Sequence, residues 1–357
     1  MKGPFELPIT AIEQLTNDCV SVSFGVPKEL TDTFSFKQGQ YLTLEKSING
    51  EKVRRSYSLY SCPLDEKWSV AIKKIPFGKF STYANDEFAV GETVWVFPPD
   101  GNFTVAVDTE QQRNYVAFAA GSGITPITSI IKTHLTQEPK AKFKLFYINQ
   151  TTASIILKEE LEALKNQFLD RFEIFYFLTK EQRSIPFLNG RINEEKLSVI
   201  FKSICDINQT DHYFLCGPEA MIQLIDGHLQ NLGVNKKQIH FELFGTDTKK
   251  TNQKKAEIKK AFKGKSCSVS IIEGGKTINF EIEQGAQNVL DAALNNAADL
   301  PFACKGGVCA TCKAKLIEGE VDMLLSYGLE DDEVEAGYVL TCQSIPTSDK
   351  VVVDFDV

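Results

Sequence analysis

Over its first hundred residues the chain is patterned as short strands separated by turns. Hydrophobic and polar positions alternate over residues 20–24, 40–44 and 69–72, and a Pro-Pro-Asp-Gly turn follows at 98–101. Alternation with a period of two places every second side chain on the same face, which predicts strands with one buried face. Strands and turns at this spacing are typical of a small antiparallel β-barrel, which we predict over residues 1–108.

Near residue 115 the alternation gives way to a continuous apolar run. Residues 115–120 are typical of a buried parallel strand, and they lead into the segment G-S-G-I-T-P at 121–126 and then into a helical pattern. Further strands are predicted at 143–148, 172–178 and 212–215. Because these strands alternate with helices, we predict a doubly wound α/β domain over residues 109–245.

The rest of the chain divides into a polar segment and a third domain. Residues 246–266 hold eight lysines and few apolar residues, which predicts a solvated linker. A hairpin over 267–282 and a helix at 289–296 follow, which is the order of elements in an α+β, β-grasp fold. We therefore predict a multidomain protein whose third domain spans residues 267–357, and a chain of 357 residues is long enough for three domains.

Four cysteines of this third domain carry the strongest chemical signal. They are Cys304, Cys309 and Cys312, spaced C-x4-C-x2-C, and Cys342. This is the plant-type ferredoxin arrangement that holds a [2Fe–2S] cluster. Gly306 and Gly307 are expected to supply the permissive backbone angles of such a loop. Cys267 falls outside this spacing, so we do not count it as a ligand.

A structural zinc site and a disulfide are the alternatives for these cysteines. Zinc sites favour two C-x2-C pairs or a mixture of Cys and His, and only one such pair is present. The N-terminal residues contain no export segment, so nine cysteines indicate a reducing compartment, which disfavours disulfides and predicts a cytoplasmic protein.

Charge and hydropathy exclude two classes of partner. The net charge of −8 argues against a nucleic-acid partner, and no apolar run approaches the roughly 18 residues that a membrane-spanning helix needs. The acidic residues are concentrated after residue 266, where 16 Asp or Glu face 5 Lys. This surface is suited to a basic redox partner, and a merely solvated surface is the alternative.

Residues suited to a flavin nucleotide lie in the predicted barrel. Arg55 can bind pyrophosphate through its guanidinium, Tyr57 can lie along the flavin ring, and the Ser58 hydroxyl can reach the N5 edge. The candidate residues around the phosphates are Ile72, Lys73, Phe80, Ser81 and Thr82. Backbone N–H groups at a helix start bind phosphate oxygens. Taken alone, R-x-Y-S is also compatible with an exposed Arg and a half-buried Tyr on an ordinary strand.

The α/β segment offers a second nucleotide site. A strand, a glycine-rich turn and a helix start can hold a dinucleotide pyrophosphate, although the third glycine of the Rossmann fingerprint is absent. Ligands of such folds bind at the carboxyl ends of the strands. Candidates at these ends are Gly121, Ser122, Gly123, Thr125, Cys216, Gly217 and Pro218. A turn without a ligand remains the alternative, and Cys216 is either a small buried hydrophobe or a neighbour of the nicotinamide ring.

The order of these motifs resembles that of the ferredoxin–NADP reductase superfamily, and in particular of its oxygenase-reductase members with a C-terminal ferredoxin. The motifs are R-x-Y-S, G-x-x-S, G-S-G-I-T-P, C-G-P and the ferredoxin cysteines. Within that group, residues 78–85, 157–161 and 327–330 are similar to reductase components of phenylacetyl-CoA epoxidases. The resemblance implies FAD in the barrel, NADPH (or NADH) in the α/β domain and a [2Fe–2S] cluster in the ferredoxin domain.

The resemblance also implies roles for individual residues. Glu242 and Phe244 would lie beside the flavin, and Ser58, Cys216 and Glu242 would form the catalytic pocket. Ser154 and Lys180 would hold a 2′-phosphate, although the arginines that many NADPH-dependent relatives carry are replaced here by Gln150 and Lys180. The implied activity is electron transfer from NAD(P)H to a separate oxygenase component.

Two alternatives to this function stay open. One is the reductase of a different Rieske or diiron hydroxylase, because acceptor specificity resides in a surface rather than in a motif. The other, of a different class, is a non-enzymatic redox sensor or electron carrier whose nucleotide-binding folds are vestigial.

Overall fold

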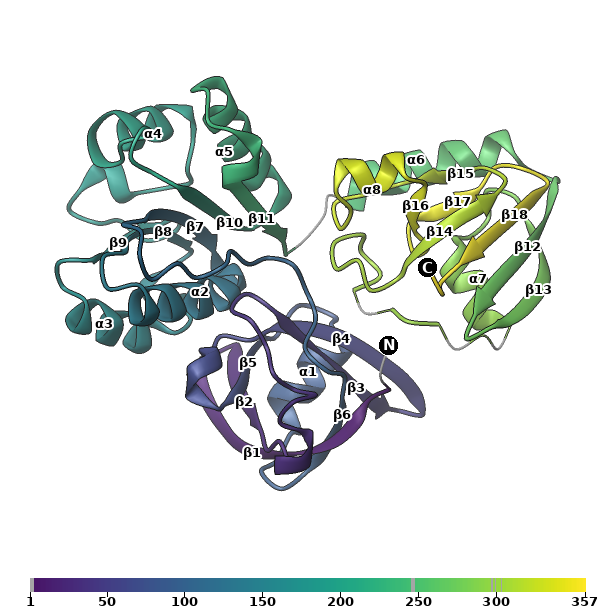
Figure 1. The fold of residues 1–357 in the computed structure, drawn as a ribbon, viewed down its shortest axis with the longest axis horizontal. Coiled ribbons are helices and arrows are strands. Elements are labelled where there is room, and N and C mark those ends of the chain that lie inside the picture. The colour runs from purple at the N-terminus through teal and green to yellow at the C-terminus, as the bar shows by residue number, and fades with distance from the viewer. Residues whose placement is uncertain (1–2, 245–247, 297, 299, 303) are drawn as a thin grey trace. The chain divides into compact units, whose positions relative to one another are not determined.

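The computed structural model describes residues 3–244, 248–296, 298, 300–302 and 304–357. The chain forms two compact units, Lys2–Phe244 and Gly245–Val357 (Figure 1). The first unit contains two hydrophobic cores and the second contains one. No helix in the described part of the chain is long and apolar enough to cross a membrane.

A six-stranded antiparallel sheet in the order β4-β3-β6-β1-β2-β5 begins the first unit. Its strands are β1 (Phe5–Thr16), β2 (Cys19–Phe24), β3 (Tyr41–Ile48), β4 (Glu51–Ser58), β5 (Trp68–Lys73) and β6 (Thr93–Val96). A bridge from Leu59 to Val70 joins the end of β4 to β5 and closes the sheet. Phe80 of helix α1 (Lys79–Asp86) is buried in its core. The predicted antiparallel barrel is confirmed.

A five-stranded parallel sheet in the order β11-β10-β7-β8-β9 follows. Its strands are β7 (Asn114–Ala120), β8 (Lys142–Asn149), β9 (Phe172–Leu178), β10 (His212–Gly217) and β11 (Ile239–Leu243). The chain starts in the centre at β7, runs outward to β9, and returns to β10 on the other side. The strand order therefore reverses between β7 and β10, where doubly wound folds bind their ligands.

Helices cover both faces of this sheet, as the alternating pattern predicts. Helices α2 (Ile124–Gln137) and α3 (Lys158–Gln167) lie on one face, and α4 (Glu194–Val199) and α5 (Glu219–Asn231) on the other (Figure 1). Strand β7 is apolar from Tyr115 to Ala120 because neighbouring strands and helices bury both of its faces.

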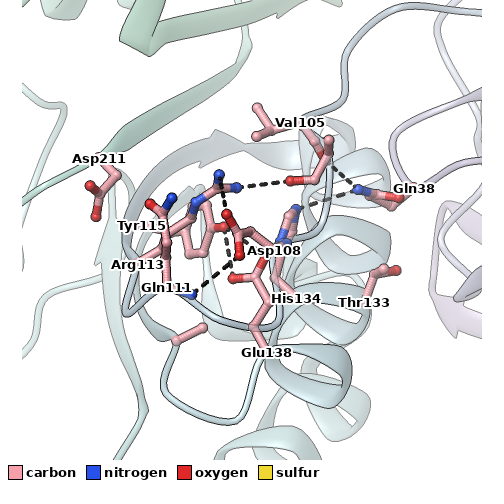
Figure 2. A network of polar contacts seen from close by, with 12 residues as sticks. Gln38, Val105, Asp108, Gln111, Arg113, Tyr115, Thr133, His134, Glu138 and Asp211 are labelled. Atoms are coloured by element: carbon pink, nitrogen blue, oxygen red, sulfur yellow. Dashed lines mark hydrogen bonds and ion pairs between the residues drawn. The ribbon is translucent and has the colours of Figure 1, made fainter.

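A buried polar network fastens the barrel to α2 (Figure 2). The side-chain amide of Gln38, which precedes β3, donates to the carbonyl of Val105 (2.7 Å) and lies 3.4 Å from Nε2 of His134. Nδ1 of His134 is 2.9 Å from Glu138. Because the amide nitrogen can only donate, Nε2 of His134 accepts and its Nδ1 carries the proton that faces Glu138.

The second unit is built on a five-stranded mixed sheet in the order β13-β12-β18-β14-β16. Its strands are β12 (Ser266–Glu273), β13 (Lys276–Glu283), β14 (Lys313–Glu318), β16 (Tyr338–Leu340) and β18 (Lys350–Asp354), and β15 (Val321–Met323) pairs with β17 (Ser344–Pro346). Helix α7 (Val289–Asn295) packs on the sheet, and α8 (Asp331–Glu335) precedes β16. The predicted α+β ferredoxin fold is confirmed.

The segment for which a solvated linker was expected contains a helix. Residues Thr248–Ala261 form α6, in which Ile258 is buried and Lys254 pairs with Asp322 at 2.6 Å. The lysines keep the outer face of α6 charged, and the single apolar residue of its packed face is too weak a periodic signal to predict a helix.

Candidate redox site

The site begins where β4 of the barrel meets β11 of the α/β fold. The hydroxyl of Ser58, at the end of β4, donates to Glu242 on β11 over 3.3 Å. Ser58 is buried, whereas Arg55 is exposed and Tyr57 is half-buried on the same strand. The structure thus brings together two predicted site residues that lie 184 positions apart in the sequence.

Tyr57 is held in place by an aromatic neighbour. Its ring lies 5.7 Å from that of Phe80, which anchors the start of α1 in the barrel core. Burial raises the pKa of the Tyr57 hydroxyl well above its usual value, so the ring stays neutral.

The segment before α1 is bent tightly around Ser81. Its hydroxyl accepts from the N–H of Ile75 (3.3 Å) and lies 3.4 Å from the carbonyl of Gly78. A Cβ on Gly78 would lie 2.4 Å from the Ser81 hydroxyl, so a larger residue there would have to displace the Ser81 side chain. Thr82 N–H donates to Gly78 O. The side chain of Ile72 is buried in the barrel core, which leaves only its backbone for a ligand, and Lys73 lies 3.5 Å from Asp18.

The glycine-rich turn lies at the point where the strand order reverses. Gly121 has a φ of +54°, and a Cβ there would point into open space. A Cβ on Gly123 would instead lie 2.4 Å from the carbonyl oxygen of Cys216 at the end of β10. Thr125 closes the turn by donating to Ser122 O over 3.1 Å. This open turn at a helix start fits a dinucleotide pyrophosphate.

Cys216 and Glu242 face each other across neighbouring parallel strands. They are register partners of β10 and β11, and Glu242 also contacts Ser58. Cys216 is fully buried, and burial raises the pKa of its thiol well above the usual value, so the thiol is neutral. Beyond them, Gly217 (φ +157°) precedes Pro218 and accepts from the N–H of Phe244 over 3.0 Å.

A cavity of about 330 Å³ opens at the carboxyl ends of β8 and β9. Ser154, predicted to bind a 2′-phosphate, belongs to the turn beside it, but its hydroxyl donates to Thr151 O (2.8 Å) and accepts from Thr151 N–H (3.0 Å). Lys180 lies on the neighbouring strand end, where its N–H donates to Gln150 O. The sequence analysis missed Glu181 and Thr152, which line the cavity and bond to each other.

The four predicted cluster cysteines meet as two pairs. Cys304 N–H points at Cys309 Sγ (3.4 Å), and Gly306 N–H points at Cys304 Sγ (3.2 Å). The Cys309 side chain and nearby backbone N–H groups lower the pKa of Cys304 to about 6. The Cys312 side chain and burial raise the pKa of Cys342 well above its usual value. Within the described residues no three metal-binding side chains converge on one point, and two pairs of thiols fit a cluster of two irons instead.

The backbone of the cysteine loop takes unusual angles at several positions. Lys305, Gly307 and Ala310 have φ of +51°, +76° and +53°, whereas Gly306 has no positive φ. A Cβ on Gly307 would lie 2.9 Å from Gln343, whose amide donates to Lys305 O over 3.0 Å. The loop is thus shaped so that N–H groups face sulfur, and a cluster of thiolates needs such donors.

Comparison with known families matches three regions of the chain. The oxidoreductase FAD-binding domain matches residues 6–105, the oxidoreductase NAD-binding domain matches 118–227, and the 2Fe-2S iron-sulfur cluster binding domain matches 271–347.

Similar proteins extend over nearly the whole chain. One component of the 1,2-phenylacetyl-CoA epoxidase from Escherichia coli (strain K12) is 40% identical over 353 residues, which are 98% of this chain and 97% of that protein. The ferredoxin reductase component of 3-ketosteroid-9-alpha-monooxygenase from Rhodococcus rhodochrous is 31% identical, over 98% of this chain and 96% of that protein. Among solved structures, phthalate dioxygenase reductase has the same fold, with a TM-score of 0.63 at 22% identity over 99% of this chain and 98% of that one.

Proposed function

Because the chain belongs to the oxygenase reductases of the ferredoxin–NADP reductase superfamily, those with a C-terminal 2Fe-2S domain, we propose that it supplies electrons to a phenylacetyl-CoA epoxidase. The chain is an NAD(P)H-dependent oxidoreductase with FAD and a [2Fe–2S] cluster, and it serves a separate oxygenase. The 40% identity to the Escherichia coli epoxidase component supports this acceptor and a role in phenylacetate catabolism.

The hydrogen bond between Ser58 and Glu242 is the observation that best supports the proposed electron transfer within the first unit. This bond connects Ser58, which is proposed to reach the N5 edge of the flavin, with strand β11, which is proposed to border the nicotinamide pocket. FAD, when bound, accepts two electrons as hydride and releases them singly, and the cluster carries one electron at a time. The protein's contribution is to orient the two nucleotides, and Ser58, Cys216 and Glu242 are placed to do so.

The remaining residues are assigned to binding. Arg55 and the backbone of 80–82 would hold the FAD phosphates, and Tyr57 would pack along the flavin ring. Gly121, Ser122, Gly123 and Thr125 would hold the dinucleotide pyrophosphate, with Gly217, Pro218 and Phe244 beside the nicotinamide. Cys304, Cys309, Cys312 and Cys342 would hold the cluster.

We also propose a cytoplasmic location. The sequence contains nine cysteines, of which four are assigned to the cluster, and a reducing compartment keeps such residues from forming disulfides. Fractionation of the producing cells tests this proposal, and recovery of the protein outside the cytoplasm would contradict it.

An anaerobic titration tests the electron path. The purified protein is mixed with NADH or NADPH while its flavin and iron–sulfur absorbance bands are recorded. Bleaching of both bands is expected. Flavin bleaching without cluster reduction would overturn the proposed path, and a protein that contains no flavin would overturn the reductase function.

The acceptor is tested by reconstitution. Turnover of phenylacetyl-CoA with the oxygenase subunits of the epoxidase is expected, with NAD(P)H as the electron source. The alternative acceptor is another oxygenase, either a Rieske or a diiron hydroxylase. The 31% identity to the reductase component of a steroid monooxygenase supports an acceptor other than the epoxidase. Faster turnover with such a hydroxylase would replace the epoxidase as the acceptor.

The role of Ser58 is tested by Ser58→Ala. Loss of one hydrogen bond at the reacting edge is expected to slow flavin reduction about tenfold. Ser56→Ala is the matched control, because Ser56 lies on the same strand but pairs with Thr43 (3.0 Å) instead of Glu242. Equal rates for the two variants in stopped-flow measurements would remove Ser58 from the site.

A further inference from the structure

The side chain of Gln343 lies next to the last of the four predicted cluster cysteines. Gln343 directly follows Cys342, and only 5% of its surface is exposed. Its backbone N–H donates to Leu340 O over 2.8 Å, and its carbonyl accepts from the N–H of Leu324 over 3.0 Å. The side chain is therefore attached to a backbone whose polar groups are both held by the surrounding strands.

The amide nitrogen of Gln343 donates to two acceptors at the cluster site. Nε2 lies 3.0 Å from the carbonyl oxygen of Lys305 and 3.6 Å from Sγ of Cys342. Because a carbonyl oxygen can only accept, the amide atom that faces Lys305 is the nitrogen and not the oxygen. The NH2 group carries two protons, so it can serve Lys305 with one and the sulfur with the other.

Packing and the unpaired oxygen of the amide indicate why a glutamine stands here. A Cβ on Gly307 would lie 2.9 Å from Cγ of Gln343, so the loop packs closely against this side chain. Oε1 of Gln343 is buried and has no hydrogen-bond partner among the described residues. Such an oxygen destabilises a fold, and an apolar side chain of similar size would avoid that cost. The arrangement therefore favours a role for the donated hydrogen bonds over a role in stability.

A hydrogen bond to a cysteine ligand changes the redox equilibrium of an iron–sulfur cluster. Reduction adds an electron whose charge is shared with the thiolate sulfurs, so a donor at sulfur stabilises the reduced form more than the oxidised form. Backbone N–H groups are the donors at Cys304 and Cys309. At Cys342 the donor is the side chain of Gln343, which a substitution can remove.

We propose that Gln343 is a positioning residue that raises the reduction potential of the cluster by donating a hydrogen bond to Cys342 Sγ, while Lys305 O holds the amide in place. The proposal rests on the cluster ligands proposed above, and it adds a side chain that lies outside that ligand set.

Gln343→Met tests the proposal, because methionine has nearly the same length and volume but no N–H donor. The full-length holoenzyme is titrated anaerobically with a chemical reductant and redox mediators, and the reduced cluster is followed by its EPR signal. At the midpoint potential of the wild type, the ratio of reduced to oxidised cluster is expected to fall about tenfold in the variant. This change corresponds to a potential lower by about 59 mV for a one-electron couple. The iron content per protein is expected to stay at the wild-type value.

Gln284→Met is the matched control. Gln284 belongs to the same unit, is 1% exposed, and also donates two bonds from its amide, to Ser266 O (2.9 Å) and to Asp349 (3.0 Å). Neither acceptor is a cysteine or belongs to the cysteine loop, so the cluster potential is expected to stay at the wild-type value. An equal shift in both variants would show that general loosening of the fold lowers the potential, and would overturn the proposal.

A second readout needs no substitution. The wild-type protein is labelled with nitrogen-15 in its glutamine side chains, its cluster is reduced chemically, and pulsed EPR detects the nitrogen nuclei close to the unpaired spin. A coupling from a glutamine side-chain nitrogen is expected, and its absence would overturn the proposal even if Gln343→Met bound no iron.

The failure of this inference differs from the failure of the function on which it rests. An unchanged potential in Gln343→Met with full iron content would overturn the role of Gln343 and leave the reductase function intact. A wild-type protein that binds no iron would overturn the cluster ligands and this inference together.

Discussion

At Gly123 the turn that follows β7 lies close against the end of β10. The position of Gly123 faces the carbonyl of Cys216, 2.4 Å from where a Cβ would stand, and the Cys216 backbone is fixed by the parallel ladder on both sides. Backbone atoms cannot move aside as the end of a flexible side chain can. The glycine is therefore required by packing rather than by its backbone angle.

Gly123→Ala is expected to destabilise the first unit by about 1–3 kcal/mol, since the new methyl group forces the ends of β7 and β10 apart. Gly227→Ala is the control, because Gly227 lies inside α5 and a Cβ there meets nothing within 4 Å. That change is expected to be neutral or stabilising by up to about 1 kcal/mol. Urea unfolding of both variants checks the difference, and equal stabilities would contradict the packing argument.

At the scale of elements, the network in Figure 2 holds a buried anion between α2 and the segment that leaves the barrel. Glu138 is fully buried and accepts from Tyr115 OH (2.8 Å), from Asp108 N–H (2.9 Å) and from His134. Burial alone would raise the pKa of Glu138, but these hydrogen bonds outweigh it and lower the pKa below the usual value. The carboxylate therefore stabilises the fold only while it is ionised.

Glu138→Gln is expected to lower the free energy of unfolding by about 3 kcal/mol at pH 7, because an amide cannot accept all three donors. The loss is expected to shrink as the pH falls below the unfolded-state pKa of 4.5, where the wild-type carboxylate loses its advantage. Glu110→Gln, on an exposed carboxylate, is the control. Denaturant titrations at several pH values would contradict the argument if the two variants behaved alike.

A second element-scale prediction concerns His212 on β10 and His240 on the neighbouring strand β11. His240 Nε2 lies 3.1 Å from His212 Nδ1, and burial, with a smaller contribution from His212, lowers the pKa of His240 from 6.5 to about 4. The folded state thus binds fewer protons than the unfolded chain between these values. Stability is full above pH 6.5 and is expected to fall towards pH 4 by about 1.4 kcal/mol per pH unit.

His240→Phe removes this proton uptake and keeps a ring to pack on Phe214, whose ring centroid lies 5.3 Å from that of His240. The variant is expected to show a shallower loss of stability between pH 6.5 and 4 than the wild type. Free energies of unfolding measured across this range check the slope, and identical slopes would show that His240 does not titrate in the unfolding reaction.

The predicted and the observed elements also differ in ways that show which features of the fold the sequence could predict. Alternation and apolar runs predicted the barrel and the parallel sheet, because burial on one or two faces leaves a direct imprint on local residue order. Family resemblance alone placed Ser58 and Glu242 in one pocket, and their direct hydrogen bond was not predicted, since no local pattern specifies a pairing across 184 positions. The contact of Glu181 with Thr152 was missed for the same reason, because the two residues lie 29 positions apart. In the cysteine loop the positive φ angles fall at Lys305, Gly307 and Ala310 and not at Gly306, so residue type predicted only the angle at Gly307.

At the scale of the whole molecule, the proposed electron path is divided between two units with separate cores. Residues proposed for the flavin and the nucleotide lie in Lys2–Phe244, and the four cysteines lie in Gly245–Val357. A change confined to one core is therefore expected to leave the other part of the path working.

Cys342→Ser tests this division. Loss of one of four cluster thiols is expected to abolish the iron–sulfur absorbance and the bound iron, while NADH or NADPH still reduces the flavin and ferricyanide still accepts its electrons. Cys267→Ala is the matched control, because Cys267 is fully buried in the core of the same unit but stands outside the cysteine spacing, so iron content is expected to persist. Full iron content in Cys342→Ser would remove Cys342 from the ligand set. Loss of flavin reduction together with the iron would show that the two units depend on each other for folding, and would contradict their independence.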